Sequence, residues 1–291
     1  MSLRPERQAP PEIFYNESEA RKYTTSSRII EIQAKLTERA LELLALPQDG
    51  APRLLLDIGC GSGLSGETLA ENGHHWIGLD ISESMLDIAL EREAEGDLLL
   101  GDIGQGLGVR PGVIDGAISI SAVQWLCNAD KSCNDPRKRL KCFFGSLYRC
   151  LARGSRAVLQ MYPENGAQLE MISTAAMRSG FSGGLVVDYP HSTRAKKYFL
   201  CLLCGPPSAN TPLPKAKGED GGSGSDESED DDEHETVDFL ERQRPTKKRK
   251  SEKKVKGRAW VLKKKEQRRN HGFTNVPRDT KYTARKRKAR F

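Results

Sequence analysis

The residues with the most chemical information are a glycine cluster that directly follows an acidic residue. Residues 54–66 read LLLDIGCGSGLSG, so an apolar run includes Asp57 and leads into Gly59, Gly61 and Gly63. The run has the composition of a buried parallel strand, and the glycines allow the following turn to approach a ligand closely. In a doubly wound sheet, such a turn lies at the carboxyl end of the strand, where ligands bind.

The acid distinguishes this turn from a dinucleotide site. The dinucleotide fingerprint has a wider spacing after its second glycine, and Asp57 would repel the pyrophosphate that binds at the helix amides. Asp57 suits a ligand with a cationic end, such as the amino group of an amino acid. A second acid, Asp80, follows a short apolar segment about twenty residues further on, where a carboxylate binds ribose in such sheets. Together the two acids fit S-adenosylmethionine, a sulfonium amino acid joined to a nucleoside without phosphate.

Three motifs resemble, in order, the ligand motifs of class I methyltransferases. They are DIGCGSG at 57–63, GLD at 78–80 and GDI at 101–103. The resemblance implies an α/β fold with a seven-strand doubly wound sheet whose last strand is antiparallel, which is ordinary for such sheets. An ordinary parallel sheet with glycine turns is the alternative.

The resemblance also implies a role for each acid. Asp57 and the glycine turn would face the methionine end of the cofactor, and Asp80 would accept both ribose hydroxyls, since a carboxylate only accepts hydrogen bonds. Asp102 with Ile103 would meet the adenine. Asp57 as a helix cap and Asp102 as a turn stabiliser are the alternatives. The predicted cofactor-binding residues are Asp57, Gly59, Cys60, Gly61, Gly63, Asp80, Ile81, Asp102, Ile103, Ser119, Tyr15 and Tyr23.

A helical period precedes the first strand. Apolar residues recur at helical spacing over 27–46, and Pro47 and Gly50 predict its end. This extension resembles the segment that caps the ligand in many methyltransferases, so Tyr15 and Tyr23 either close over the cofactor or pack against the helix. Strands are predicted at 54–58, 75–79, 97–100, 113–120, 156–161, 185–188 and 197–203, and further helices at 62–72, 83–94, 136–151 and 167–179.

Charge divides the chain of 291 residues into a folded part and a tail. Residues 1–205 carry 22 Lys and Arg and 25 Asp and Glu, whereas 219–241 carry twelve acids and no Lys or Arg. Residues 242–291 carry 22 Lys and Arg and three acids, a net charge of +19. Such charge blocks are disordered when free. The predicted organisation is an N-terminal extension with a capping helix at 1–50, a methyltransferase domain at 51–205, an acidic disordered linker at 206–241 and a basic tail at 242–291.

The basic tail is predicted to bind RNA. Its clusters at 247–250 and 285–288 have the composition of a nuclear import signal or a nucleic-acid patch. Interleaved aromatic residues offer the stacking faces that RNA recognition uses, namely Trp260, Phe273, Tyr282 and Phe291. A merely solvated tail is the alternative.

Cysteine and hydropathy patterns exclude several other classes. The seven cysteines show no disulfide or zinc pattern and are interpreted as reduced thiols, so no metal site is predicted. Cys201 and Cys204 form a C-x-x-C within an apolar strand, where they would point to opposite faces as buried thiols. The first residues lack the pattern of a secretory signal, and no apolar run is long enough to span a membrane.

The acceptor side is predicted from the end of the fourth strand. Residues 119–126 read SISAVQWL, without the Asn/Asp-Pro-Pro-aromatic motif of exocyclic-amine methylation or the Pro-Cys pair of cytosine C5 methylation. What remains is an acceptor with its own exposed lone pair, such as guanine N7. Such a reaction requires the alignment of two reactants and no general base. The residues expected to line the acceptor side are Ser121, Gln124, Trp125 and Tyr162.

The whole chain resembles the eukaryotic small-subunit (18S) rRNA guanine-N7 methyltransferases, also described as the bud-site-selection or Williams–Beuren-region methyltransferase family. The matching stretches lie at 10–15, 119–126, 162–163, 260–267 and 279–283. The resemblance implies small-subunit assembly in the nucleus and nucleolus, with binding of small-subunit rRNA and pre-ribosomal particles. It also implies a heterodimer with a small zinc-binding activator subunit. An assembly factor whose scaffold role outweighs its catalysis is the alternative. A small-molecule methyltransferase is disfavoured by the basic tail, which would supply phosphate contacts.

The resemblance also places the third predicted strand at one edge of the sheet. Residues 97–100 read DLLL and contain none of the Lys, Pro or inward charges that protect a free edge. We therefore expect the activator to add a strand along 97–100. The alternative is that the local helix and the N-terminal extension cover this edge.

Overall fold

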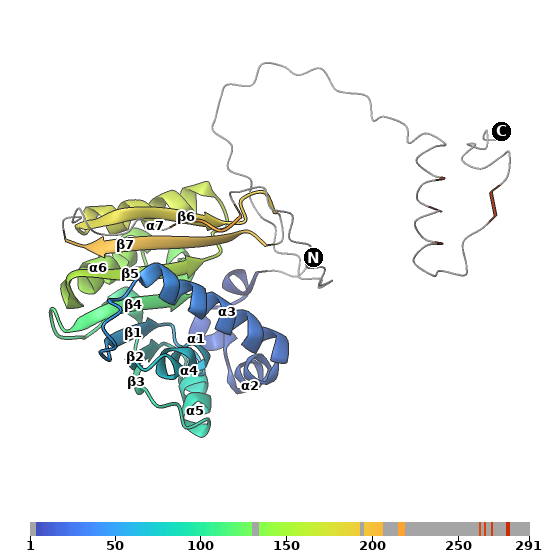
Figure 1. Ribbon diagram of the computed structural model, residues 1–291. Helices are drawn as coiled ribbons and strands as arrows, with labels where there is room; N and C mark the ends of the chain where they lie inside the picture. The colour runs from blue at the N-terminus through green and yellow to red at the C-terminus, as the bar shows by residue number, and fades with distance from the viewer. Residues whose placement is uncertain are drawn as a thin grey trace, which may run out of the picture. The chain divides into compact units, whose positions relative to one another are not determined.

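The computed structural model describes residues 4–129, 134–192, 195–205 and 215–218, together with Leu262, Lys265, Arg269, Arg278 and Asp279. The chain forms two units, residues 1–239 and 240–291 (Figure 1). In the second unit, Asp279 pairs with Lys265 at 2.9 Å and with Arg269 at 2.8 Å. The rest of the predicted basic tail lies outside the described residues.

The first unit is built on a seven-stranded sheet with the order β3-β2-β1-β4-β5-β7-β6. β7 runs antiparallel to both β5 and β6, and the other neighbours are parallel. The predicted fold class is therefore confirmed, and so is the position of the third strand at an edge. The strands are β1 (Leu54–Ile58), β2 (His75–Asp80), β3 (Asp97–Leu100), β4 (Ile114–Ile120), β5 (Leu151–Met161), β6 (Phe181–Asp188) and β7 (Lys197–Cys204).

Helices cover both faces of this sheet (Figure 1). The helical segments are η1 (Pro5–Arg7), α1 (Pro11–Phe14), α2 (Glu17–Thr25), α3 (Ser27–Leu44), α4 (Leu64–Glu71), α5 (Glu83–Glu91), η2 (Ile103–Gln105), η3 (Val123–Cys127), α6 (Pro136–Cys150) and α7 (Gly166–Arg178). α6 and α7 pack on one face, and α3 and α4 pack on the other. No helix in the described part of the chain is long and apolar enough to cross a membrane.

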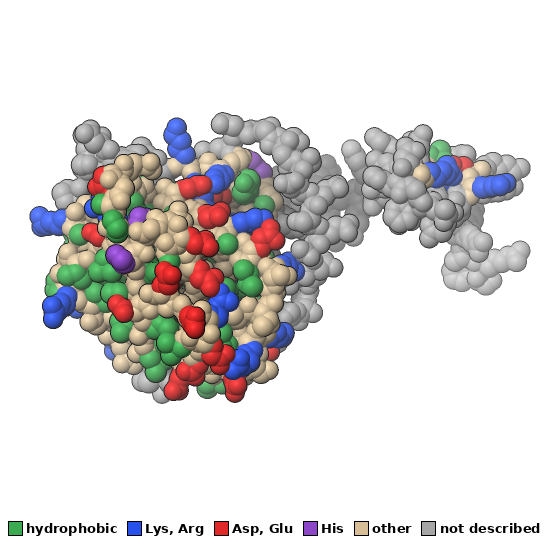
Figure 2. All heavy atoms as spheres, turned by 60° about the horizontal axis from the view of Figure 1, so that its bottom comes forward, with side chains coloured by type: hydrophobic (Ala, Val, Ile, Leu, Met, Phe, Trp, Pro, Cys, Tyr) green, Lys and Arg blue, Asp and Glu red, His purple; other side chains and the backbone are tan. Residues whose placement is uncertain are grey.

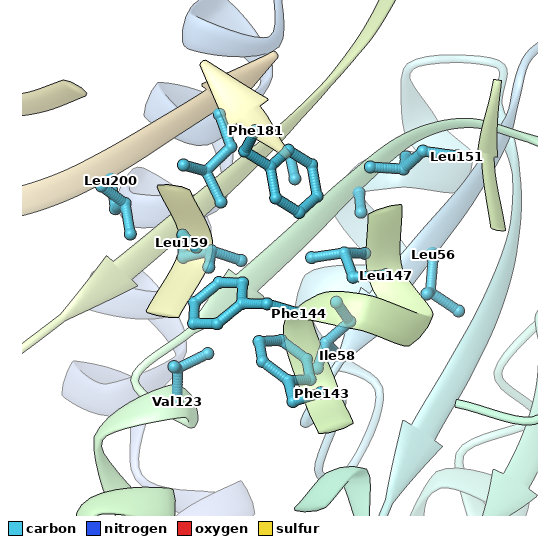
Figure 3. Close-up of a cluster of buried hydrophobic side chains, with 14 of the residues drawn as sticks. Leu56, Ile58, Val123, Phe143, Phe144, Leu147, Leu151, Leu159, Phe181 and Leu200 are labelled. Carbon is cyan, nitrogen blue, oxygen red and sulfur yellow. The ribbon is translucent and has the colours of Figure 1, made fainter. Parts of the chain in front are cut away.

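Alternating side chains of each strand supply the two cores. Leu56 and Leu159 belong to the core under α6 and α7, whereas their neighbours Leu55 and Val158 belong to the core under α3. Figure 3 shows the first core, where aromatic side chains of α6 pack against those of the strands. Cys201 and Cys204 are both buried and fall in different cores, as predicted for residues on opposite faces.

Several element boundaries differ from the prediction. The helix expected over 136–151 ends at Cys150, and β5 begins at Leu151 instead of 156, with a register irregularity opposite Ile114 and Gly116. β6 begins at Phe181 because it pairs along the whole of β7, so the glycines at 183–184 lie inside a strand. α3 ends at Leu44 because Ala45 adopts a left-handed conformation with φ 46°, before Pro47 is reached.

Part of the predicted disordered linker packs against the first unit, which corrects that assignment at residues 215–218. Arg39 binds the carboxylate of buried Asp188 and also donates to the carbonyl of Lys215 at 2.6 Å. The amide of Lys217 donates to Asp188 Oδ1 at 2.8 Å, and the Lys217 carbonyl accepts from the Tyr189 amide. The chain is therefore held against α3 and β6 ten residues after the predicted end of the domain at 205.

Candidate cofactor and acceptor site

A pocket lies at the carboxyl ends of β1, β2, β3 and β4. The turns after these strands contribute 59–62, 80–81, 101–103 and 120–122 to its lining, and the N-terminal extension contributes Pro11, Tyr15, Tyr23 and Gln33. The sheet order changes direction between β1 and β4. The pocket thus occupies the topological switch point, where open α/β sheets bind their ligands.

The glycine turn after β1 has the conformation that its residues predict. Gly59, Gly61 and Gly63 have φ values of 75°, 53° and 81°, in the region that residues with a Cβ rarely adopt. A Cβ on Gly59 would lie 2.3 Å from the Cβ of Ala122, so this position also excludes a side chain sterically. Gly63 is the N-cap of α4 and does not line the pocket.

Asp80 fixes the shape of the turn from the neighbouring strand. Its Oδ2 accepts a hydrogen bond from the amide of Gly61, and its Oδ1 accepts one from the amide of Ser82, both at 2.8 Å. Burial raises the pKa of this carboxyl, while the two amides act in the opposite direction. Each oxygen retains acceptor capacity, so Asp80 can hold the turn and accept ribose hydroxyls together.

Asp57 lies behind the pocket instead of facing it. The side chain is fully buried, it is absent from the pocket lining, and its Oδ2 accepts a hydrogen bond from Ser65 Oγ at 2.5 Å. Burial, with a contribution from the charge of Asp80, raises the pKa of Asp57 to about 7. Ser65 does line the pocket, so this hydroxyl connects the buried carboxyl of Asp57 to the pocket. The expectation that Asp57 itself faces the methionine end is corrected accordingly.

Asp102 lines the pocket and also stabilises its own turn. Its Oδ1 accepts from the amide of Gly104 at 2.8 Å and from Arg139 Nη2 at 2.6 Å. The two roles considered for Asp102 are therefore compatible, because both contacts use one oxygen. Arg139 comes from α6 and lines the same pocket. Sequence patterns did not indicate this cation, since it lies 37 residues from its partner.

Aromatic side chains of the N-terminal extension close the pocket. The ring of Tyr15 lies 5.9 Å from that of Tyr23 and 6.0 Å from that of Trp125, measured between centroids. The carbonyl of Tyr15 accepts from Ser82 Oγ at 2.8 Å, which ties the extension to the start of α5. Both tyrosines pack against other rings and line the pocket, so the two interpretations of these residues hold together. Burial raises the pKa of both phenols, which are therefore neutral at physiological pH.

The predicted acceptor residues divide into two groups. Ser121 and Trp125 line the pocket, whereas Gln124 and Tyr162 do not. Ser121 has a φ of 57°, and its hydroxyl donates to Gln160 Oε1 at 2.7 Å, so its side chain is held at the end of β4. Ser119 is also outside the lining, because its hydroxyl donates to the carbonyl of Ile58.

The residues outside the lining hold the chain's first segment across the acceptor side. Gln124 Nε2 donates to Glu6 Oε1 at 3.2 Å, and Asn128 Nδ2 donates to the Glu6 carbonyl at 3.1 Å. Arg4 donates to the carbonyl of Tyr162 at 3.3 Å. Gln124 and Tyr162 therefore position η1 beside the pocket, a role that spacing along the sequence does not reveal.

Sequence reasoning identified Asp80, Asp102, Gly59, Gly61 and the aromatic residues that line the pocket, but it missed a second group of lining residues. Several of the missed residues lie next to a predicted motif in the sequence, so including the neighbours of each motif would have found them. The missed lining residues are Pro11, Gln33, Ser62, Leu64, Ser65, Leu79, Met85, Gly101, Ile120, Ala122, Leu126 and Arg139.

Comparisons with known proteins agree with this site. Residues 56–159 match the family model described as "Methyltransferase domain", and residues 202–289 match "Methyltransferase involved in Williams-Beuren syndrome". The chain is 68% identical over 292 residues to an Arabidopsis thaliana 18S rRNA (guanine-N(7))-methyltransferase, covering 100% of both chains. It is 58% identical to the Mus musculus enzyme of the same description, covering 100% of this chain and 99% of the relative. A Saccharomyces cerevisiae relative, 18S rRNA (guanine(1575)-N(7))-methyltransferase, is 49% identical, with 99% of each chain covered.

The chain belongs to the 18S rRNA (guanine-N7)-methyltransferase family. The resemblance stated from its motifs is confirmed over the full length, including the charged tail. Its cofactor is S-adenosylmethionine, and the residues that line the pocket fit this molecule. Asp80 retains acceptor capacity in the lining, Gly59 and Gly61 leave the turn without side chains, and Ile103 lies beside Asp102, as the predicted roles of these residues require.

Proposed function

We propose that this protein transfers a methyl group from S-adenosylmethionine to N7 of a guanine in small-subunit rRNA, during small ribosomal subunit biogenesis and pre-rRNA processing. The observation that carries the proposal is that the chain is 47–68% identical, over essentially its whole length, to six relatives. Four of them are named 18S rRNA (guanine-N(7))-methyltransferase, one is named a probable enzyme of this kind, and the name of the sixth specifies guanine 1575. The equivalent of the guanine named for the Saccharomyces cerevisiae relative is the expected target.

The chemistry of the pocket supports an acceptor that requires no base. Burial keeps the phenols of Tyr15 and Tyr23 protonated, and it raises the pKa of the Cys60 thiol well above its usual range. Among the described residues that line the pocket, these groups therefore provide neither a basic phenolate nor a thiolate nucleophile. Asp80 and Asp102 already accept hydrogen bonds that shape the site.

Guanine N7 has a lone pair and carries no proton, so it can attack the methyl group directly. The cofactor supplies an electrophilic methyl group on a sulfonium centre. The N7–carbon bond forms as the carbon–sulfur bond breaks, and S-adenosylhomocysteine leaves. The contribution of the protein is alignment: the held end of β4 at Ser121 and the ring of Trp125 form the wall where the base would enter.

The test is to map N7-methylguanine in small-subunit rRNA by chemical cleavage, in cells with and without this protein. One site should lose its methylation and regain it with the intact chain but not with an Asp80→Asn variant. If every N7-methylguanine persists without the protein, the proposed activity is wrong. The level of small ribosomal subunits in the Asp80→Asn cells distinguishes the methyltransferase function from the alternative scaffold function. An assembly factor that acts as a scaffold would restore the subunits without restoring the methyl group.

We also propose that a small zinc-binding activator subunit binds this chain by adding a strand to β3. The side chains of Leu99 and Leu100 are 41% and 61% exposed, and no described segment pairs with the outer side of β3. Exposed apolar residues on an unprotected edge favour strand addition by a partner. Figure 2 shows the end of the unit that carries α5 and β3, where hydrophobic and acidic side chains are interspersed.

The register of β3 determines which substitution tests this docking. Gly101 N donates to the carbonyl of Asp80 at 2.8 Å, and Asp80 is the partner of Leu100. In a parallel ladder, the backbone groups of Leu99 therefore face β2, and those of Leu100 face outward. Leu100→Pro removes an outward donor, whereas a proline at 99 would disrupt β2 pairing.

Co-expression of the activator with Leu100→Pro should give less complex and a less soluble chain than co-expression with the Leu100→Ala control. The control loses the same side chain and keeps the amide. Equal yields of complex with the two variants would place the activator elsewhere.

We further propose that the basic tail at 242–291 contacts RNA and that one of its clusters, 247–250 or 285–288, directs the protein to the nucleus and nucleolus. Composition supports this proposal, because the cations of the tail far outnumber its acids. The family model that matches 202–289 shows that relatives share this region. The structure of these clusters lies outside the described residues.

A further inference from the structure

The helix α6 carries a concentration of positive charge that the fold does not require. It contains five Lys and Arg residues and no acid. Arg139 pairs with Asp102, but Arg137, Lys138, Lys141 and Arg149 are exposed and have no ion-pair partner among the described residues. Cations elsewhere in the unit are paired more often, as for Arg21 with Glu91, Lys35 with Glu31 and Arg92 with Glu67.

The placement of these charges is unfavourable for the helix itself. Arg137 and Lys138 lie in the first turn, where the positive end of the helix dipole opposes cations, and no acid of that turn offsets them. Lys138 and Lys141 are three residues apart, so their like charges are neighbours on one face. Asp135 provides the N-cap through its contacts with the amides of Arg137 and Lys138. Local stability therefore does not account for the basic residues.

The same residues line two hollows on either side of α6. One lies between α6 and α7 and is lined by Arg137, Lys138, Lys141 and Arg178, and the other lies between α6 and residues 105–108. Lys138 and Lys141 line both hollows. We define the α6 basic face as Arg137, Lys138, Lys141, Arg149 and Arg178.

Two acids also border the first hollow, and neither neutralises this face. Glu164 pairs with Arg7 of η1, and Glu170 of α7 is exposed. Four cations of the lining therefore lie opposite one acid, Glu170, that forms no ion pair among the described residues. The hollow retains a net positive charge.

Gly145 lies at the centre of this surface and lines both hollows. A Cβ built on it would meet no atom within 4 Å, so nothing in the packing of the described residues requires a glycine here. A glycine within a helix costs about 1 kcal/mol relative to alanine. Its effect is to leave the helix surface flat between Lys141 and Arg149, where a bulky ligand can approach the backbone.

The hollow between α6 and α7 and the acceptor side of the pocket are lined by successive residues of η3 and its C-terminal end. Trp125 and Leu126 of this short helix line the pocket, and the next residues, Cys127 and Asn128, line the hollow. A polymer whose base enters the pocket past Trp125 would therefore pass over the start of α6. The segment that forms α5 and the start of β3 is unsuited to a polyanion, because residues 83–97 carry six acids and one arginine.

We infer that the α6 basic face is a phosphate-binding surface of the methyltransferase domain, which holds the rRNA backbone next to the target guanine. The choice of rRNA as the ligand rests on the proposed function. The basic tail would raise affinity without fixing orientation, whereas this face would set the register of the RNA relative to the pocket, as phosphate contacts do in other complexes.

The test compares the full-length chain with two double variants of equal charge. Lys138→Gln with Lys141→Gln changes the α6 basic face, and Lys22→Gln with Lys35→Gln removes two exposed cations from α2 and α3. Glutamine is a good helix former, so both variants should fold, and equal S-adenosylmethionine affinity by calorimetry checks this. Binding to an rRNA fragment that contains the target guanine is measured from about 50 to 200 mM salt.

Loss of two phosphate contacts lowers the log–log salt slope by about 1.4–1.8. Over this fourfold range of salt, the parent chain should lose roughly tenfold more affinity than the α6 variant. The control variant should match the parent. An α6 variant with the same salt slope as the parent overturns the inference, and this is the result expected if the face binds a protein partner instead of RNA. A control variant whose slope falls as much as that of the α6 variant also overturns it.

Cys142 provides a second readout that does not depend on catalysis. It is exposed on α6 and, with Lys138 and Lys141, lines the hollow between α6 and residues 105–108. The rRNA fragment should slow alkylation of Cys142, measured on the peptide, in the parent and control chains but not in the α6 variant. Unprotected Cys142 in the RNA-bound parent contradicts the inference. Failure of the proposed function is a separate result, namely unchanged rRNA methylation in cells that lack the protein.

Discussion

Burial of Asp57 predicts that the stability of the protein falls as pH rises from about 4 to 7. The pKa of this carboxyl is raised from 3.8 to about 7 by burial, with Asp80 adding to the effect. Between these values the native state holds a proton that the unfolded state has released. The free energy of unfolding therefore decreases by about 1.36 kcal/mol per pH unit from this group, and the decrease ends above the native pKa.

The perturbation that isolates this effect is Asp57→Asn. Asparagine can still accept from Ser65 Oγ, which lies 2.5 Å from Oδ2. Its amide nitrogen would occupy the position of Oδ1, which has no hydrogen-bond partner among the described residues, so burial of this unpaired donor costs the variant about 1–3 kcal/mol. This loss is independent of pH, so the slope and not the absolute stability reports the ionisation.

Urea unfolding of both full-length proteins at pH 5 and pH 7, followed by tryptophan fluorescence, measures the difference. Over two pH units the parent should lose about 2–3 kcal/mol more than the variant. Asp80 titrates in both proteins and largely cancels in the comparison. Parallel changes in the two proteins would show that Asp57 is ionised throughout this range and would refute the reasoning from burial.

Three further perturbations test other parts of the molecule. Asp80→Asn should weaken S-adenosylmethionine binding by at least tenfold in calorimetry, with a lower melting temperature because the Gly61 amide loses a charged acceptor; unchanged affinity contradicts the ribose assignment. Deletion of 242–291 should weaken RNA binding and flatten its salt dependence while cofactor affinity is retained, and an unchanged salt slope counts against the role of the tail. Gly66→Ala should lower the free energy of unfolding by about 1–3 kcal/mol, because its Cβ would lie 2.1 Å from Trp76; a stability equal to that of the parent argues against this packing.

The sequence alone determined the fold class and the main positions of the site. Apolar runs followed by Asp57, Asp80 and Asp102 specify strands and their carboxyl ends, and the glycines at 59–63 specify the turn. These are local patterns, since strand composition and turn conformation follow from residues that are close in the chain. The strand order was implied by the resemblance that these motifs carry, and the observed sheet order agrees with it.

The tertiary structure decided how distant segments meet at the site. Arg139 reaches Asp102 across 37 residues, and Gln124 holds Glu6 across 118. Residues 215–218 of the predicted linker bind Arg39 and Asp188, although no pattern in the sequence assigned them to the domain. No periodicity in the sequence encodes such pairs, because they depend on which faces of separate elements pack together.

The orientation of each acid was also a tertiary outcome. The motif predicts that Asp57 lies near the ligand, but whether its carboxylate faces the pocket or Ser65 depends on how α4 packs over β1. The unpaired cations of α6 are visible in the sequence as a composition. Only the fold shows that they border hollows beside the acceptor pocket and that acids from α7 do not neutralise them. Their shared surface exists because α6, α7 and η3 meet on one face of the sheet, an arrangement that long-range packing creates and local sequence does not.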